Sequence, residues 1–127
     1  MTVRVFRIEE DAEEITYQGR QYVRLCPVEA VPPGTAAVVH VDGEDVALFH
    51  CHEGVFALGN RCAHQHVSVL ADGVLEGLSV RCPRHGWRYD LRTGKAVEGS
   101  GCVPVYGVLP QGGWFYVERP TQSWQWS

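Results

Sequence analysis

The stretch RCAHQHVSVLADGVLEGLSVRCPRHGWRYD, residues 61–90, decides how this sequence folds. It holds two matched pairs of metal-binding residue types, Cys62-x-His64 and, after seventeen intervening residues, Cys82-x-x-His85. Each pair supplies one thiol and one imidazole from a predicted loop between strands. One such pair would mean little, but two matched pairs at this separation indicate a metal centre held between two loops.

Two kinds of metal centre are compatible with these ligands. Zinc sites usually space their paired ligands two to four residues apart, which suits Cys82 and His85 but not the tighter Cys62-x-His64 pair. A [2Fe–2S] cluster in which two histidines replace two cysteines on one iron explains both pairs. His66 competes with His64 as the imidazole of the first pair. The residues favour an iron–sulfur centre and leave a structural zinc module as the alternative.

Around this stretch, the pattern predicts short strands nearly throughout. Residues 36–41, 46–51 and 55–58 are apolar runs separated by Asp42-Gly43-Glu44 and Glu53-Gly54, which predicts a three-stranded meander. Further strands are expected at residues 3–6, 22–25, 78–81, 87–90, 103–108 and 114–117. We therefore predict one all-β domain over residues 1–127, with a loop-rich, cluster-binding subdomain at about 59–96.

Composition excludes several functions. The chain has 127 residues, a net charge of −4 and no basic run, which argues against nucleic-acid binding. It has no apolar run long enough to span a bilayer, and its first ten residues lack the apolar core of a signal peptide, so we expect a cytoplasmic protein without a membrane partner. Five cysteines cannot all pair in disulfides, and in a reducing compartment a spaced pair is more often used for metal.

The motif Cys62-Ala-His64-Gln-His66, followed by Cys82-Pro-Arg-His85-Gly-Trp-Arg-Tyr-Asp and by Leu-Arg-Thr-Gly-Lys, resembles the C-x-H…C-x-x-H pattern of Rieske proteins. The resemblance extends over roughly residues 22–117. It implies the Rieske fold, an antiparallel β-sandwich or partial barrel with a small cluster-binding subdomain. It also implies one [2Fe–2S] cluster, with Cys62 and Cys82 on the inner iron and His64 and His85 on the outer iron.

The sequence departs from high-potential Rieske proteins of respiratory complexes at three positions. Val67 and Arg84 replace the cysteines that join the two loops in those proteins, and Trp87 replaces a serine that donates to a cluster sulfide, whereas Tyr89 keeps the family's tyrosine. Because hydrogen bonds to the sulfurs stabilise the reduced cluster, we expect a reduction potential near the low end of the Rieske range, roughly −150 mV.

The resemblance implies an electron carrier rather than an enzyme. We expect a Rieske ferredoxin that takes single electrons from a flavoprotein reductase and passes them to a terminal oxygenase, with no small-molecule substrate of its own. The alternative is the small subunit of an assimilatory nitrite reductase, a group in which many chains lack the four ligands.

Other cysteines, histidines and tryptophans are interpreted as structural. His50-Cys51-His52 is predicted to be an ordinary strand end, and Cys26 and Cys102 to be small packing residues. Trp124 and Trp126, in the polar C-terminal tail, are expected to dock on the body of the protein.

Overall fold

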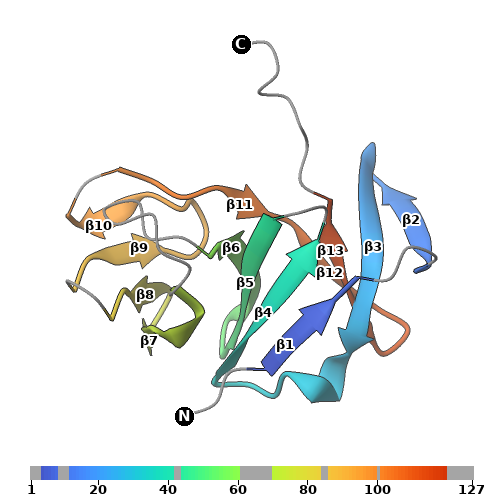
Figure 1. The fold of residues 1–127 in the computed structure, drawn as a ribbon, viewed down its shortest axis with the longest axis horizontal. Coiled ribbons are helices and arrows are strands. Elements are labelled where there is room, and N and C mark those ends of the chain that lie inside the picture. The colour runs from blue at the N-terminus through green and yellow to red at the C-terminus, as the bar shows by residue number, and fades with distance from the viewer. Residues whose placement is uncertain are drawn as a thin grey trace.

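The computed structural model describes residues 4–8, 12–41, 44–60, 70–83, 86–99 and 101–119. This part of the chain forms thirteen strands and two 3-10 helices, η1 (Val28–Ala30) and η2 (Leu70–Asp72), arranged in three sheets (Figure 1). Each helix is a single short turn, so nothing helical among the described residues is able to span a bilayer. The all-β prediction is confirmed.

The central sheet has the strand order β1-β4-β5-β6-β11. Its bounds are β1 (Arg4–Arg7), β4 (Thr35–Val41), β5 (Glu44–Cys51), β6 (Gly54–Gly59) and β11 (Val105–Tyr106). The strands β4, β5 and β6 pair antiparallel in sequence order, which confirms the predicted meander. One pair differs from the antiparallel expectation, because β1 lies parallel to β4 at the edge of the sheet.

A second sheet, with the order β12-β13-β3-β2, packs against one face of the central sheet. It consists of β2 (Glu14–Tyr17), β3 (Arg20–Pro27), β12 (Val108–Gln111) and β13 (Trp114–Glu118). The core between the sheets joins Val39 and Val46 of the central sheet to Val23, Phe115 and Val117 of the second. Along β4, the alternating residues Ala37, Val39 and Val41 enter this core, as expected for a β-sandwich.

The third sheet, with the order β10-β9-β8-β7, covers the opposite side of the central sheet (Figure 1). Its four strands are β7 (Val74–Glu76), β8 (Ser79–Arg81), β9 (Arg88–Asp90) and β10 (Ala96–Glu98). Ala47 and Phe49 of β5 pack with Val80 and Tyr89 of this sheet, whereas Val46 and Leu48 face the other core. Because β5 is covered on both faces, its sequence is an almost continuous apolar run.

One predicted strand is divided between two sheets. The expected strand at 103–108 is interrupted at Gly107, so that β11 pairs with β6 and β12 pairs with β13. A Cβ at residue 107 would lie 2.7 Å from the Tyr22 hydroxyl, and the Gly107 N–H donates to Glu118 Oε1 at 2.8 Å. Close packing at this crossing therefore requires glycine, which the run of apolar residues concealed.

The short strands β2, β7 and β10 were not predicted. Each has three or four residues, and their outward side chains include charged groups that hide the alternation. The turn at 42–43 and the tail with Trp124 and Trp126 lie outside the described residues. The domain limits, including the subdomain at about 59–96, remain predictions.

Candidate metal centre

Of the four predicted ligands, Cys82 lies in the described part of the chain, and Cys62, His64 and His85 lie outside it, as does His66. Cys82 directly follows β8 and is 1% exposed. It belongs to the core between the central and third sheets, together with Leu58, Leu70 and Tyr89. A thiol in this position suits the inner side of a metal centre, because it is shielded from water by apolar side chains.

The second motif segment, residues 82–87, is closed at its base by backbone hydrogen bonds. The Cys82 N–H donates to the Trp87 carbonyl at 2.6 Å, and the Gly86 N–H donates to the Cys82 carbonyl at 3.1 Å. Gly86 has φ +77°, a left-handed conformation that other residues rarely adopt. This positive φ explains the glycine after His85, since the space beside it is open apart from an Arg81 nitrogen at 3.8 Å.

Asn60 connects both ends of the first motif segment, residues 61–69. Its side chain is almost fully buried, and Oδ1 accepts a hydrogen bond from the Ala71 N–H at 2.7 Å. The Asn60 carbonyl accepts from the Leu70 N–H at 3.4 Å, and the Asn60 N–H donates to the Asp45 carbonyl at 2.9 Å. One residue thus fixes the start of the segment to its end and to β5. No role for Asn60 was predicted from the sequence.

The two motif segments leave the fold from neighbouring positions. Gly73, just after η2, pairs so closely with β8 that an added Cβ would overlap the Arg81 carbonyl oxygen and lie 2.9 Å from Val80 Cγ2. Leu70 and Cys82 also pack in the same core. The residue that follows the first segment, Leu70, and the residue that begins the second, Cys82, therefore lie in one core, which suits a cluster held between the two segments. The donor set, together with the burial of Cys82, fits a [2Fe–2S] cluster.

Two aromatic side chains lie near this region: Tyr89 of β9, and Trp87, which directly precedes that strand. Tyr89 is fully buried in the core that contains Cys82, and Trp87 is half-buried. The indole of Trp87 lies over Gly99, where an added Cβ would overlap the ring. Trp87 therefore packs both against the core that contains Cys82 and against Gly99, in the turn after β10. A hydrogen bond from Tyr89 toward a cysteine sulfur stays a prediction.

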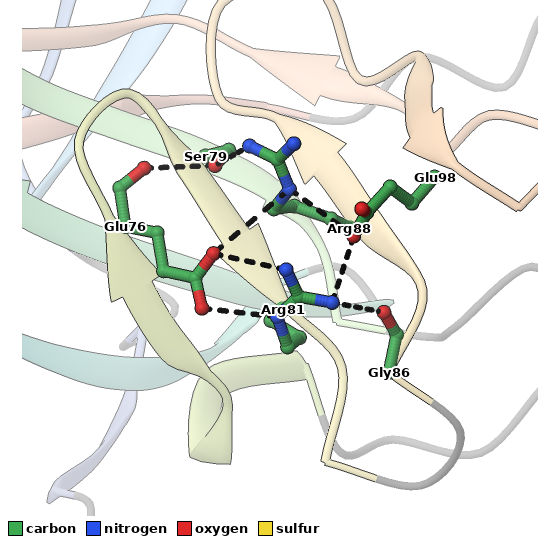
Figure 2. A network of polar contacts seen from close by, with 6 residues as sticks. All are labelled: Glu76, Ser79, Arg81, Gly86, Arg88 and Glu98. Carbon is green, nitrogen blue, oxygen red and sulfur yellow. Dashed lines mark hydrogen bonds and ion pairs between the residues drawn. The ribbon is translucent and has the colours of Figure 1, made fainter.

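A network of charged side chains covers the outer face of the third sheet (Figure 2). Arg81 pairs with Glu76 through Nε at 2.9 Å and Nη2 at 3.1 Å, and with Glu98 through Nη1 at 2.8 Å. Arg88 adds longer ion pairs to the same two carboxylates and donates to Ser79 Oγ at 3.1 Å. Glu76 and Glu98 accept hydrogen bonds from Arg81, and these bonds lower the pKa of both carboxyl groups and raise the pKa of the Arg81 guanidinium.

The remaining candidate ligands are structural. Cys51 is buried and its thiol donates to the Gly54 carbonyl at 3.4 Å, while His50 Nδ1 lies 2.6 Å from the Val31 carbonyl oxygen. Within the described residues, no group of three or more metal-ligating side chains is present. Cys26 is buried as expected, but Cys102 is exposed because it lies at an isolated bridge to Lys95 at the surface.

Comparison with known proteins decides the family. The model of the Rieske [2Fe–2S] domain matches residues 21–109. The chain belongs to the Rieske [2Fe–2S] domain family. This membership confirms the predicted fold and the prediction of one [2Fe–2S] cluster as cofactor, and it disfavours the zinc alternative. The assignment of Cys62, His64, Cys82 and His85 as its ligands remains a prediction.

Known proteins of two kinds resemble this one. The biphenyl dioxygenase ferredoxin subunit of Pseudomonas sp. (strain KKS102) is 34% identical over 72% of this chain and 85% of its own length. The ferredoxin of carbazole 1,9a-dioxygenase from Nocardioides aromaticivorans IC177 is 29% identical, with a TM-score of 0.70 over 79% of this chain and 98% of that one. A putative NADH-dependent nitrite reductase small subunit from Mycobacterium tuberculosis shares the fold, with a TM-score of 0.74 at 24% identity over 86% and 98% of the two chains.

Proposed function

We propose that this Rieske protein is the ferredoxin component of an oxygenase system. It receives single electrons from a flavoprotein reductase and passes them to a terminal oxygenase, without itself oxidising a substrate. The observation that carries the proposal is its likeness to the biphenyl dioxygenase ferredoxin subunit over 85% of that protein's length. The nitrite reductase small subunit is similar at 24% identity, which is evidence for the fold alone.

The predicted ligands and the burial of Cys82 suit an electron carrier. When bound, a Rieske cluster supplies one-electron chemistry at a potential set by its ligands and by hydrogen bonds to its sulfurs. Cys62 and Cys82 would hold its inner iron, and His64 and His85 its outer iron. The buried position of Cys82 suits the thiolate side, and Asn60 links the described residues on either side of the segment that contains Cys62 and His64.

Electron transfer is the direct test. Anaerobic protein that contains its cluster would be mixed with NADH and a flavoprotein reductase of an aromatic-ring dioxygenase system, and bleaching of its visible absorbance would be followed. The reduced protein would then be mixed with the oxidised terminal oxygenase of that system. We expect one electron per cluster to be taken up and then passed on at rates that saturate with protein concentration.

Two results would overturn the proposal. The first is a cluster that chemical reductants reduce but that exchanges no electrons with reductases or terminal oxygenases from several such systems. The second is co-purification of the chain, at a fixed ratio, with a large subunit that contains sirohaem, which would identify a nitrite reductase small subunit. A cytoplasmic location remains a prediction, to be tested by cell fractionation.

A further inference from the structure

Arg81 reaches across the second motif segment from its entry to its exit. The residue lies at the end of β8, directly before Cys82, and its Nη1 donates to the Gly86 carbonyl at 2.7 Å (Figure 2). Gly86 directly follows His85 in the sequence. The side chain thus connects the residue before one predicted ligand to the peptide after the other.

Two carboxylates orient the guanidinium for this contact. Glu76, on β7, accepts from Nε and Nη2 in a bidentate arrangement, and Glu98, on β10, accepts from Nη1. These strands lie at the two edges of the third sheet, with β8 and β9 between them. The planar fork of an arginine is able to serve both carboxylates and the Gly86 carbonyl together, whereas a lysine ammonium acts as a single point charge.

The ion pairs alone do not account for this arrangement as a source of stability. The Arg81 side chain is 35% exposed and those of Glu76 and Glu98 are 39% and 51% exposed, so solvent screens their attraction. The hydrogen bond to Gly86 differs, because its acceptor is a backbone carbonyl of the motif segment itself, beside the bonds from the Cys82 N–H to Trp87 and from the Gly86 N–H to Cys82. We therefore expect this hydrogen bond to affect the conformation of the segment that contains Cys82 and His85 more than the stability of the whole fold.

We propose that Arg81 is a positioning residue for the cluster: by holding the Gly86 carbonyl, it keeps the segment between Cys82 and His85 in the conformation that retains the [2Fe–2S] group. The inference rests on the predicted ligands and not on the identity of the electron-transfer partners. Arg88 provides a matched control, because it pairs with the same carboxylates and makes no hydrogen bond to the Gly86 carbonyl.

Four variants separate positioning from charge: Arg81→Lys, Arg81→Gln, Arg88→Lys and Arg88→Gln. Each would be purified with its cluster, and release of iron to a chelator would be followed by loss of visible absorbance. We expect both Arg81 variants to release iron about fivefold faster than the parent, the factor that corresponds to one net hydrogen bond. Both Arg88 variants should stay within about twofold, as expected for exposed ion pairs.

Electron paramagnetic resonance of the reduced cluster gives a readout that loss of stability alone would not move. We expect shifted or broadened g values in Arg81→Lys and Arg81→Gln, and the parent spectrum in both Arg88 variants. If Arg81→Lys matches the parent in spectrum and in iron release, the residue acts by charge and the proposal is wrong. Equal effects in the Arg81 and Arg88 variants would likewise overturn it, because a general stabilising network would then be sufficient.

A further variant covers failure of the Arg81 variants to fold or to take up iron. Glu76→Gln with Glu98→Gln removes the two orienting carboxylates and keeps the arginine. We expect faster iron release than in the parent, and unchanged release would contradict the proposal. Because none of these measurements uses a reductase or an oxygenase, they stand or fall separately from the proposed function.

Discussion

The two outer sheets of this Rieske protein cover the same central sheet but are held to it differently. The second sheet, β12-β13-β3-β2, has strands of four to eight residues, and its valines and phenylalanine form an apolar core with β4 and β5. All four strands of the third sheet have three residues. Strands so short contribute few ladder hydrogen bonds, so the third sheet depends on its core residues, its turns and the charged network.

The difference teaches where the cluster matters for folding. Each of the two predicted thiolate ligands belongs to one motif segment, and both segments are rooted beside the third sheet. A metal group bound between them would join these short elements in the way that structural metals organise small domains. The second sheet shares an extensive apolar core with the central sheet, so it does not depend on a metal group for its stability.

Removal of the cluster should therefore accelerate amide hydrogen exchange in the third sheet much more than in the second. We expect amides of β8 and β9 to exchange at least about a hundredfold faster in cluster-free protein, equivalent to roughly 2.7 kcal/mol of local stability. Amides of β3 and β13 should change by less than about threefold. Hydrogen exchange read by mass spectrometry, with and without cluster, measures both. A uniform acceleration over all three sheets would contradict the comparison.

The turns of the two regions differ in the space they allow. Gly94, between β9 and β10, has φ +74°, and an added Cβ would overlap the Val103 carbonyl oxygen. Gly112, between β12 and β13, has φ +63° with nothing within 4 Å of an added Cβ. The two glycines share the backbone requirement and differ in packing.

We expect Gly94→Ala to lower the free energy of unfolding by about 2–5 kcal/mol, the sum of left-handed strain and overpacking. Gly112→Ala should cost only about 1–2 kcal/mol, since strain is its whole effect. Anaerobic guanidinium unfolding of both variants, followed by circular dichroism, tests the pair. Equal losses would show that the turn of the third sheet is no more tightly packed than the turn of the second.

How much of this the sequence predicts depends on the length of the local signal. The meander of β4, β5 and β6 was predicted because apolar runs of four to six residues alternate with Asp-Gly and Glu-Gly turn signals. The cluster was predicted from the spacing of two Cys/His pairs, and family membership confirms it. Each apolar run, each turn signal and each Cys/His pair lies within a few consecutive residues.

What the sequence did not predict depends on contacts between distant residues. Nothing in the local sequence marks Asn60, but its buried side chain accepts a hydrogen bond from the Ala71 N–H and so links the residues on either side of 61–69. Arg81 reads as an exposed strand residue, and its bond to Gly86 becomes visible only once β7, β8 and β10 are aligned. The secondary-structure propensity of a residue carries no information about such long-range hydrogen bonds, because the tertiary packing of the chain determines which residues meet.

Asn60 offers a smaller test of the same comparison. In Asn60→Ala the buried Ala71 N–H loses its acceptor, which should cost about 1–3 kcal/mol of unfolding free energy. We expect Asn60→Ala to release iron faster and to accelerate exchange in η2, with little change in β3 and β13. If it leaves iron release unchanged, the link across residues 61–69 does not contribute to holding the cluster.

The smallest expected effect is the response of the charged network to acid. Arg81 holds the pKa of Glu76 and of Glu98 below the usual 4.5 through hydrogen bonds. A carboxylate with a lowered pKa stabilises the fold above its unfolded pKa, and this contribution is lost as the pH falls through the folded pKa. The network should therefore be at full strength at pH 6 and should weaken below a pH of about 4.5, close to the usual glutamate pKa.

In Glu76→Gln with Glu98→Gln, unfolding midpoints between pH 6 and pH 3.5 should fall less steeply than in the parent. Glu53→Gln, at an exposed turn of the central sheet, should keep the parent's slope, and a double variant with that same slope would exclude the network as a source of acid sensitivity.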